Sequence, residues 1–328
     1  MRIDVHTHYI PEVAIQKVRQ GKGIDGIVAE SQNGSEYLVH PSLGMRYPIK
    51  PEFSDRAAKL NHMDRLGIDI SILSVVPLWL FHWSPAEIAQ DFCREANNWL
   101  ADFVSGSDRL IGMATVPLQA PDEAAKELRR ATTDLGLQGV QIGTTVNGIP
   151  LDDKIFKPFF DTAEELGSTV SIHPCYSGKP PQFEDYYMKN LTGNPLATAT
   201  AASRLILSGF LDRHPRLKVI LVHAGGFMPY QIGRLDHGYK VRQEASAHIQ
   251  KRPSEYLRRF YFDTITHAPA PLAFLVDLVG QDRVILGTDI PFDMADTDFS
   301  RIIEQAQLPP NTTTAIESGN AMELFNLD

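Results

Sequence analysis

Two histidines stand one residue apart near the start of the chain, in the stretch DVHTH. His6 and His8 follow a short run of strand-forming residues, and alternate side chains of a strand point to the same face. Two imidazoles on one face can direct two nitrogen atoms at a single ion. The pair therefore predicts half of a metal site, provided that other parts of the chain supply the remaining ligands.

Further groups of this kind stand at the ends of other apolar runs. His173 ends TVSIH, His223 ends KVILVH and Asp289 ends VILGTD. Three neutral imidazoles and one carboxylate suit a borderline divalent ion such as zinc and leave a position open to water or substrate. Such an ion lowers the pKa of its bound water towards about 7 and so makes hydroxide available at neutral pH. His223 stands one strand beyond His173, so it is better placed as a general acid or base than as a fourth imidazole ligand. The alternative interpretation is that these histidines only bond to backbone groups.

These residues need a fold that brings the ends of strands together. Most of the apolar runs are near-continuous in Val, Ile and Leu, which is typical of strands buried on both faces of a parallel sheet. Helical patterns lie between them, for example SDRAAKLNHMDRLG with Ser54 as its N-cap. Eight strands alternating with helices predict a (β/α)8 barrel, an α/β fold of the TIM type whose active sites lie at the carboxyl ends of the strands. The eight runs cover residues 2–5, 70–76, 110–116, 139–143, 169–173, 218–223, 260–265 and 284–289.

The longest connection follows the first run and covers about residues 9–53. Two short strand-like runs there flank the tripeptide NGS, which is a hairpin signal. An insertion after the first strand leaves the barrel at the carboxyl end of that strand, so we expect it to overhang the active site. We expect residues 1–328 to form a single domain that carries this small insertion.

Composition excludes several classes of function. A net charge of −9 and a pI near 5.7 argue against a nucleic-acid partner, because no basic stripe is available to neutralise phosphates. No apolar run approaches the roughly 20 residues of a membrane span, and the first residues lack the apolar core of a signal peptide. Cys93 and Cys175 form no CxxC pair, so we expect free thiols and a cytoplasmic protein. No dinucleotide or Walker A motif indicates an organic cofactor.

The motifs DVHTH, SIHP, VHAGG and LGTDIPF resemble the amidohydrolase superfamily. The resemblance is to its branch of mononuclear metal-dependent decarboxylases, which includes the aminocarboxymuconate-semialdehyde decarboxylases, and it spans nearly the whole chain. It implies one divalent metal ion, zinc or alternatively manganese, with His223 acting on the metal-bound water. It implies as metal ligands His6, His8, His173 and Asp289, of which Asp289 also belongs to the catalytic set.

The same resemblance implies two arginines that bind substrate. Arg46 lies in GMRYPIK on the insertion, and Arg234 lies in YQIGRLDH, which in this branch reaches into the site of a neighbouring subunit. A homodimer with Arg234 acting in trans is therefore expected. A guanidinium group binds a carboxylate through two hydrogen bonds, so two arginines suit a substrate with two acid groups. His267 follows the seventh run and is a further candidate for binding a substrate carboxylate or carbonyl.

The function expected from these features is non-oxidative decarboxylation of a small unsaturated or aromatic mono- or dicarboxylic acid. The exit of the fourth run, GVQIGTT, offers neither a lysine for carbamylation nor a glutamate, which argues against a binuclear hydrolase. Three alternatives stay open on the same residues. They are hydrolysis of a lactone or amide, hydration of a conjugated diacid, and a non-catalytic metal-binding scaffold.

Overall fold

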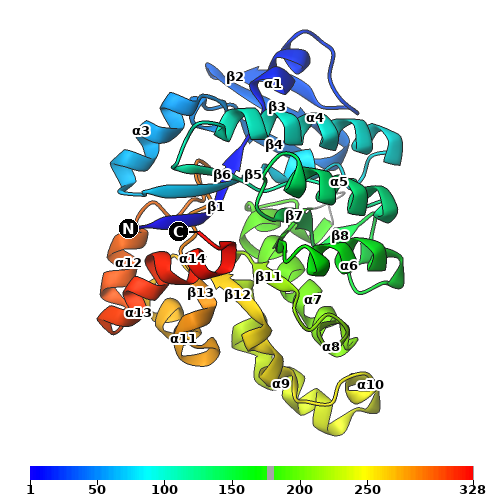
Figure 1. The fold of residues 1–328 in the computed structure, drawn as a ribbon, viewed down its shortest axis with the longest axis vertical. Coiled ribbons are helices and arrows are strands. Elements are labelled where there is room, and N and C mark those ends of the chain that lie inside the picture. The colour runs from blue at the N-terminus through cyan, green and yellow to red at the C-terminus, as the bar shows by residue number, and fades with distance from the viewer. Residues whose placement is uncertain (176–180, 328) are drawn as a thin grey trace.

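A closed ring of parallel strands lies at the centre of the computed structural model, which describes residues 1–175 and 181–327 (Figure 1). Hydrogen bonds order these strands as β1-β5-β6 and as β13-β12-β11-β10-β7. Parallel bridges from Thr7 to Ile290 and from Ala114 to Val140 join the two sets at both edges. The barrel strands are β1 (Ile3–Tyr9), β5 (Ile70–Val75), β6 (Leu110–Gly112), β7 (Val140–Gly143), β10 (Thr169–His173), β11 (Lys218–Leu221), β12 (Phe260–Asp263) and β13 (Val284–Ile285).

Each of the eight predicted runs forms one of these strands, which confirms the prediction of a (β/α)8 barrel. The reason is visible in their burial. Every residue of β7 and β10 is buried, because the barrel interior covers one face and the helices cover the other.

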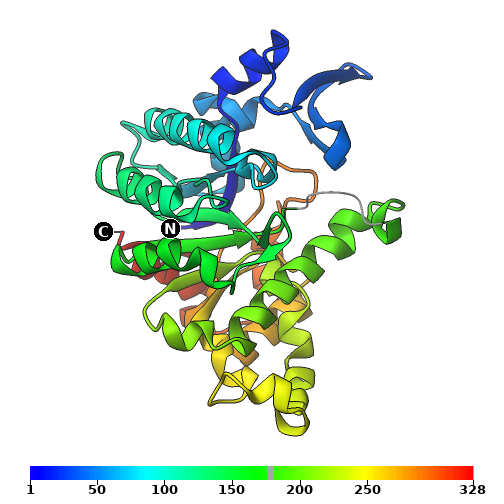
Figure 2. The ribbon, with the colours of Figure 1, turned by 90° about the vertical axis from the view of Figure 1, so that its right-hand side faces the viewer.

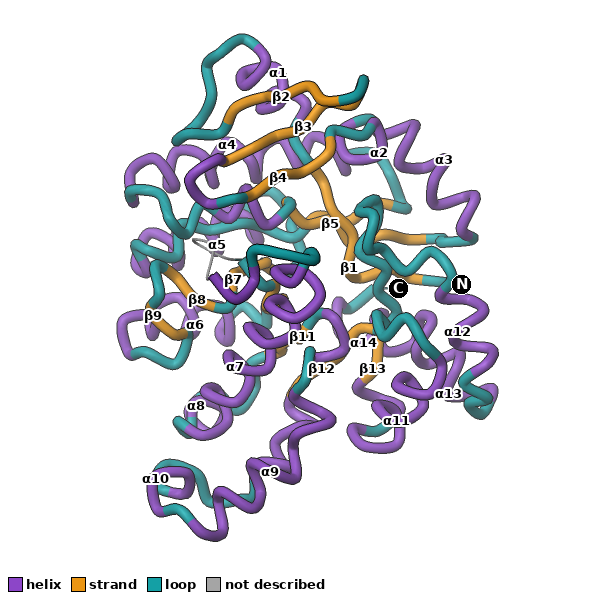
Figure 3. The backbone as a smooth tube through the Cα atoms, turned by 180° about the vertical axis from the view of Figure 1, so that it is seen from behind, coloured by secondary structure: helices purple, strands orange, loops and turns teal. Residues whose placement is uncertain are grey.

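Helices surround the barrel and connect its strands (Figure 3). The prediction of Ser54 as a helix cap was wrong by one residue, because Asp55 accepts the hydrogen bond from the backbone N of Ala58 at 2.7 Å. The helices are α1 (Glu12–Arg19), α2 (Pro51–Ser54), α3 (Arg56–Leu66), α4 (Ala86–Val104), α5 (Pro121–Thr133), α6 (Lys157–Glu165), α7 (Asn194–Leu207), α8 (Phe210–Arg213), α9 (Met228–Val241), α10 (Gln243–Ser246), α11 (Pro269–Val279), α12 (Phe299–Gln305), α13 (Pro310–Thr314) and α14 (Asn320–Phe325).

The segment between β1 and α3 carries an antiparallel sheet beside the barrel. Its strands are β2 (Val28–Gln32), β3 (Ser35–His40) and β4 (Met45–Pro48). Asn33 and Gly34 both have positive φ between β2 and β3, as the predicted hairpin turn requires. In Figure 2 this sheet stands on the side of the barrel towards which the start of α7 also extends.

Apolar contacts fix this sheet to the barrel. Leu38 and Met45 from the sheet belong to one buried cluster with Val75 at the end of β5 and Trp79 just beyond it. The short strands β8 (Thr145–Val146) and β9 (Ile149–Pro150) form a separate hairpin after β7. The sheet of residues 28–48 is therefore held at the carboxyl ends of the barrel strands, where the sequence placed the candidate site.

Helix α9 and the short α10 extend away from the barrel at one end of the molecule (Figure 1). None of the helices in the described residues is both long enough and apolar enough to cross a membrane.

Candidate metal centre

Three histidines and one aspartate from distant parts of the chain meet at the mouth of the barrel. Each offers one ligand atom, and these four atoms lie within 4.8 Å of one another. His8 Nε2 is 3.2 Å from His6 Nε2 and 2.9 Å from Asp289 Oδ1. All four side chains are buried. The structure thus brings together His6, His8, His173 and Asp289, the residues that the sequence indicated as metal ligands.

Backbone irregularities in β1 and at Asp289 direct the side chains of these residues towards the cluster. The pairing of β1 with β5 shifts between Asp4 and Thr7, which is the signature of a bulge, and bulges re-aim side chains near active sites. Asp289 has a φ of 64°, in the left-handed region that few residues other than glycine, asparagine, aspartate and histidine adopt. The backbone N of Asp289 donates to the carbonyl O of His6 at 2.7 Å. Strand β1 therefore positions both its own histidines and the aspartate.

Each of the three histidines donates from Nδ1 to an acceptor outside the cluster. The acceptors are Asp263 Oδ2 for His6 at 2.8 Å, the Val75 carbonyl for His8 at 3.3 Å and the Pro174 carbonyl for His173 at 2.9 Å. A proton on Nδ1 leaves the lone pair on Nε2 directed inwards.

The cluster fits a bound divalent ion. His173 Nε2 is buried and has no hydrogen-bond partner among the described residues, a costly arrangement unless a ligand completes it. A set of three imidazole nitrogens and one carboxylate oxygen suits zinc and similar transition metals.

Electrostatics at the cluster also favour a cation. Burial alone would raise the pKa of Asp289, but positive charge on His6 and hydrogen bonds from His223 and His8 hold that pKa well below its usual range. Burial lowers the pKa of His173 well below its usual range, and the neighbouring histidines lower it further. The centre therefore offers an ionised carboxylate together with a neutral imidazole, the forms that bind metal.

His223 lies beside the cluster and outside the set of four. Its Nε2 is 3.6 Å from Asp289 Oδ2, and its ring centroid is 5.2 Å from that of His173. It stands on a short turn of helix, η6 (His223–Gly225), directly after β11. The side chain is 15% exposed and borders the pocket, so it can reach a bound molecule.

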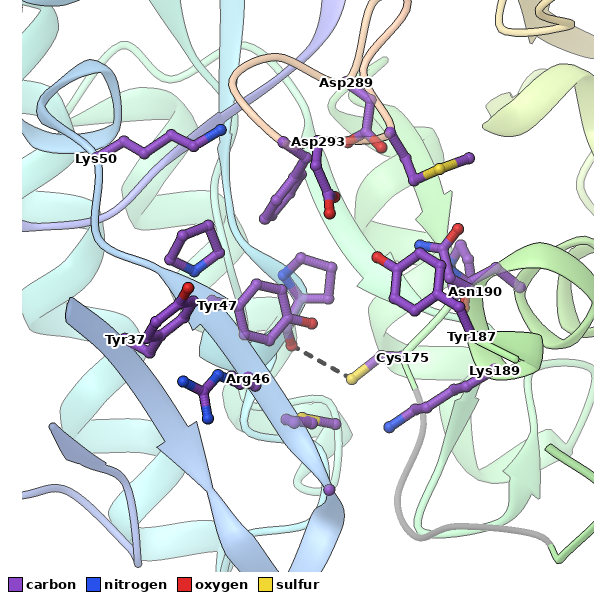
Figure 4. A pocket seen from close by; sticks show the side chains of 18 of the residues that line it. Tyr37, Arg46, Tyr47, Lys50, Cys175, Tyr187, Lys189, Asn190, Asp289 and Asp293 are labelled. Carbon is purple, nitrogen blue, oxygen red and sulfur yellow. Dashed lines mark hydrogen bonds between the residues drawn. The ribbon is translucent and has the colours of Figure 1, made fainter. Parts of the chain in front are cut away.

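A pocket of about 1100 Å³ opens above the cluster and contains His173, His223 and Asp289 in its lining. Figure 4 shows Tyr47 from the β2–β4 sheet on one side, and Tyr187, Lys189 and Asn190 on the other. Lys189 begins a π-helix, η5 (Lys189–Gly193), and its Nζ donates to the Leu43 carbonyl at 3.3 Å across the pocket. Aromatic side chains and charged groups thus face each other.

Several polar and apolar groups line the space nearest the cluster. The ring of Phe292 lies 5.1 Å from that of His8 and 5.6 Å from that of Tyr47. Burial, followed by the nearby Cys175 and Asp289, raises the pKa of Tyr47 well above its usual range, so its phenol stays protonated. Cys175 Sγ donates to the Pro77 carbonyl at 3.3 Å (Figure 4). Aromatic rings, a protonated phenol and a thiol therefore line the part of the pocket nearest the cluster.

Arg46 borders the pocket but is engaged elsewhere. Its guanidinium donates to Glu30 at 3.3 Å and to Gln32 at 2.7 Å and lies 3.8 Å from the centre of the Tyr37 ring. Along β4 it alternates with Tyr47, so the two side chains leave opposite faces of the sheet. The structure does not bring Arg46 to the metal ligands.

The two other predicted substrate residues also lie apart from the cluster. Arg234 is exposed on α9 and has no hydrogen bond or ion pair with any described residue. His267 is exposed after β12, with a φ of 55°, and it is not among the residues that line the pocket.

Two residues that support the cluster were not predicted from the sequence. Asp263 ends β12 and accepts a hydrogen bond from His6 Nδ1; an acidic residue at a strand end was the available signal. Lys59 on α3 is fully buried, donates to the carbonyl of His8 at 2.8 Å, and has its pKa lowered to about 7 by burial. No pattern distinguishes this lysine from a solvent-facing one on the same helix.

Comparison with known proteins identifies the group to which this architecture belongs. The family model described as amidohydrolase matches residues 3–327. A 2-amino-3-carboxymuconate-6-semialdehyde decarboxylase from Dictyostelium discoideum is 33% identical over 100% of this chain and 92% of its own length.

Solved structures agree with the sequence comparison. The 5-carboxyvanillate decarboxylase from Sphingomonas paucimobilis superimposes with a TM-score of 0.85 at 27% identity, covering 100% of this chain and 99% of its own. A dihydroxybenzoic acid decarboxylase from Polaromonas sp. JS666, solved with bound manganese and an inhibitor, gives a TM-score of 0.79 at 25% identity, covering 99% and 97%. With a matching family model over almost its full length, the chain belongs to the amidohydrolase family.

Proposed function

We propose that this protein is a metal-dependent, non-oxidative decarboxylase of a small aromatic or unsaturated carboxylic acid. The observation that carries the proposal is the buried group of His6, His8, His173 and Asp289 at the floor of the pocket, with His223 beside it. End-to-end similarity to decarboxylases of aromatic and muconate-type acids supports it.

One divalent ion would be held by the three Nε2 atoms and the Asp289 carboxylate. When bound, it supplies a positive charge and a Lewis-acid position for an oxygen atom of the substrate. Zinc and manganese both suit the donor set, and the relative from Polaromonas carries manganese.

His223 is the residue we assign to proton transfer. In its protonated form it donates a proton to the carbon that bears the carboxylate. The bond from that carbon to the carboxylate then breaks, its electron pair returns to the conjugated system, and CO2 leaves. One proton is taken up and one CO2 released, so no redox cofactor is needed. Asp289 Oδ2 lies 3.6 Å from His223 Nε2, on the side of the ring that faces the predicted metal ligands.

The rest of the pocket would hold the substrate flat. Phe292 and Tyr47 offer ring faces on the side of His8, and Lys189 offers a cation on the opposite side. Arg46 is proposed as a second cation for a diacid. In this role its guanidinium gives up its hydrogen bond to Glu30 and binds a carboxylate of the substrate.

A homodimer is part of the proposal. Arg234 is exposed on a helix that points away from its own barrel (Figure 1), so in a C2 dimer it would enter the pocket of the other copy. The exposed rings of Phe227 and Tyr230 on the same part of the chain provide apolar surface for such contact.

Mixing inactive variants tests the trans arrangement. Arg234→Ala and His223→Ala chains should each be inactive, and heterodimers should regain activity because one of their two sites keeps both residues. Verified heterodimers without activity would make Arg234 an ordinary surface residue.

The decisive experiment measures CO2 release from a panel of aromatic and muconate-type acids, with protein reconstituted separately with Zn²⁺ and Mn²⁺. Lactones, amides and conjugated diacids belong in the same panel. Turnover of a lactone or amide, or hydration of a diacid, with no acid losing CO2, would replace the decarboxylase by a hydrolase or hydratase. Tight metal binding with no turnover at all would favour a scaffold.

A further inference from the structure

The carboxylate of Asp263 connects the predicted metal ligands to the proposed acid/base residue. We propose that Asp263 is a positioning residue that fixes the orientation of His6 and His223 relative to each other. The roles of those two histidines rest on the proposed function. Asp263 is completely buried at the end of β12. It lies behind the cluster and is not among the residues that line the pocket.

Four hydrogen bonds define this position. Oδ2 accepts from His6 Nδ1 at 2.8 Å and from the backbone N of His223 at 2.8 Å. Oδ1 accepts from the backbone N of Ala224 at 2.7 Å and from that of Ile265 at 3.2 Å. All four donors are N–H groups, so only a residue with two acceptor oxygens satisfies them together.

The bond to His6 sets the tautomer of a metal ligand. With its proton held on Nδ1 by Asp263, His6 presents an Nε2 lone pair to the centre, 3.4 Å from Asp289 Oδ1. A carboxylate in this place also makes the imidazole more basic and fixes its plane. His8 and His173 donate from Nδ1 to neutral carbonyls instead, so among the three predicted histidine ligands only His6 has a charged partner at Nδ1.

The bonds to His223 and Ala224 hold a strained turn. Both residues have positive φ, 55° and 53°, a conformation that costs about 1 kcal/mol or more for a residue with a Cβ and persists only where the surroundings enforce it. Asp263 enforces it by accepting from two consecutive backbone N–H groups. The turn directs the His223 ring towards Asp289, so one carboxylate fixes both groups that meet there.

Asp263→Asn removes one acceptor while keeping the shape. In either orientation the amide faces one pair of N–H donors with its own NH2 group. We expect the affinity for Mn²⁺ or Zn²⁺ to fall by about 10-fold to 100-fold, measured by competition with a chelator of known affinity. At saturating metal we expect kcat to stay at least about 10-fold below wild type with KM nearly unchanged, because Asp263 does not face the pocket.

Asp296→Asn is the matched control. Asp296 is also a buried aspartate of this end of the barrel, but its carboxylate accepts only from the backbone N of Asp298 among the described residues. This variant should keep wild-type metal affinity and kcat. An equal loss in both variants would show that any buried aspartate here has the same effect and would overturn the proposal.

A measurement on the unmodified protein covers the case in which Asp263→Asn does not fold. Nitrogen NMR of the imidazoles in metal-free protein should show His6 with its proton on Nδ1, assigned by loss of its signals in His6→Gln. An Nδ1 without a proton overturns the proposal, as does an Asp263→Asn protein with wild-type affinity. A normal kcat at saturating metal would overturn the His223 half. The affinity and NMR results do not depend on decarboxylation, so they separate this proposal from the proposed function.

Discussion

The two sides of the pocket are built in different ways. On the barrel side, His6, His8 and His173 are buried and each donates to a fixed acceptor. On the side of the β2–β4 sheet, Arg46 is exposed, and its partners Glu30 and Gln32 are exposed residues of the same sheet.

This difference separates chemistry from selection. The barrel side draws on strands at opposite ends of the sequence, so a change in any one of them disturbs the shared metal centre. The sheet side comes from residues 28–48 alone and can vary while the metal centre keeps its geometry. We infer that the barrel determines what reaction occurs and that the sheet contributes to which acid is accepted.

The largest effect is expected at the barrel side. His173→Ala removes one of four ligand atoms, so metal per chain should fall well below one and activity should drop by roughly 10³-fold or more, since a bound metal contributes several kcal/mol to catalysis. Metal content by mass spectrometry and initial rates measure this. His214→Ala is the control because His214 is equally buried but lies before β11, away from the metal centre; loss of metal there would contradict the assignment.

His223→Asn should separate proton transfer from metal binding. Because His223 stands outside the set of four ligands, the variant should retain metal while kcat falls by roughly 10² to 10⁴-fold, the usual contribution of a general acid or base. The comparison of kcat with metal content decides. Metal lost in proportion to activity would make His223 a ligand instead.

His82 joins the loop after β5 to the end of β7 and predicts a pH dependence of stability on the barrel side. It is buried on the loop after β5, and its Nε2 accepts from the backbone N of Gly143 at 2.9 Å, while burial lowers its pKa to about 4. An unfolded histidine titrates near 6.5, so the unfolded state binds more protons between those values. The free energy of unfolding should therefore reach its full value above about pH 6.5 and should be lower by about 2 kcal/mol at pH 5.

Denaturant unfolding of wild type and His82→Gln at pH 8 and pH 5 measures the effect. The glutamine variant cannot titrate, so its loss between the two pH values should be smaller by about the same 2 kcal/mol. Parallel losses in both proteins would assign the pH dependence to other groups.

Sequence reasoning succeeded where a pattern has a direct geometric consequence. Continuous apolar runs identify buried parallel strands, and residues at the ends of such strands must meet at one rim, which is why the proximity of His6, His173 and Asp289 could be predicted. It also predicted that an insertion of about residues 9–53 overhangs the site, because a connection after β1 leaves from that rim, and residues between Gly34 and Lys50 do line the pocket.

It failed where a side chain's partner decides its role. Asp263 is a single aspartate whose four donors come from three separate segments, and no spacing reveals them. Lysine is a residue type that is usually exposed, but Lys59 is buried and donates a hydrogen bond to the carbonyl of His8. The direction of Arg46 depends on Glu30 and Gln32, which the motif GMRYPIK does not contain.

Arg46 therefore gives the smallest and sharpest test of the comparison. If its guanidinium leaves Glu30 to bind a second carboxylate of the substrate, Arg46→Met should raise KM for diacids by about fivefold, while KM for monoacids and kcat change little. A partly exposed ion pair of this kind is worth about 0.2–1 kcal/mol, so releasing Arg46 from it should help binding by up to that amount. Glu30→Gln should accordingly lower KM for the same diacids, by less than about fivefold. If KM for diacids rises in Arg46→Met and falls in Glu30→Gln, Arg46 must leave Glu30 when the diacid binds. If Glu30→Gln raises KM as Arg46→Met does, the pair serves only to hold the sheet, and selection of the second acid group belongs to the opposite wall with Lys189.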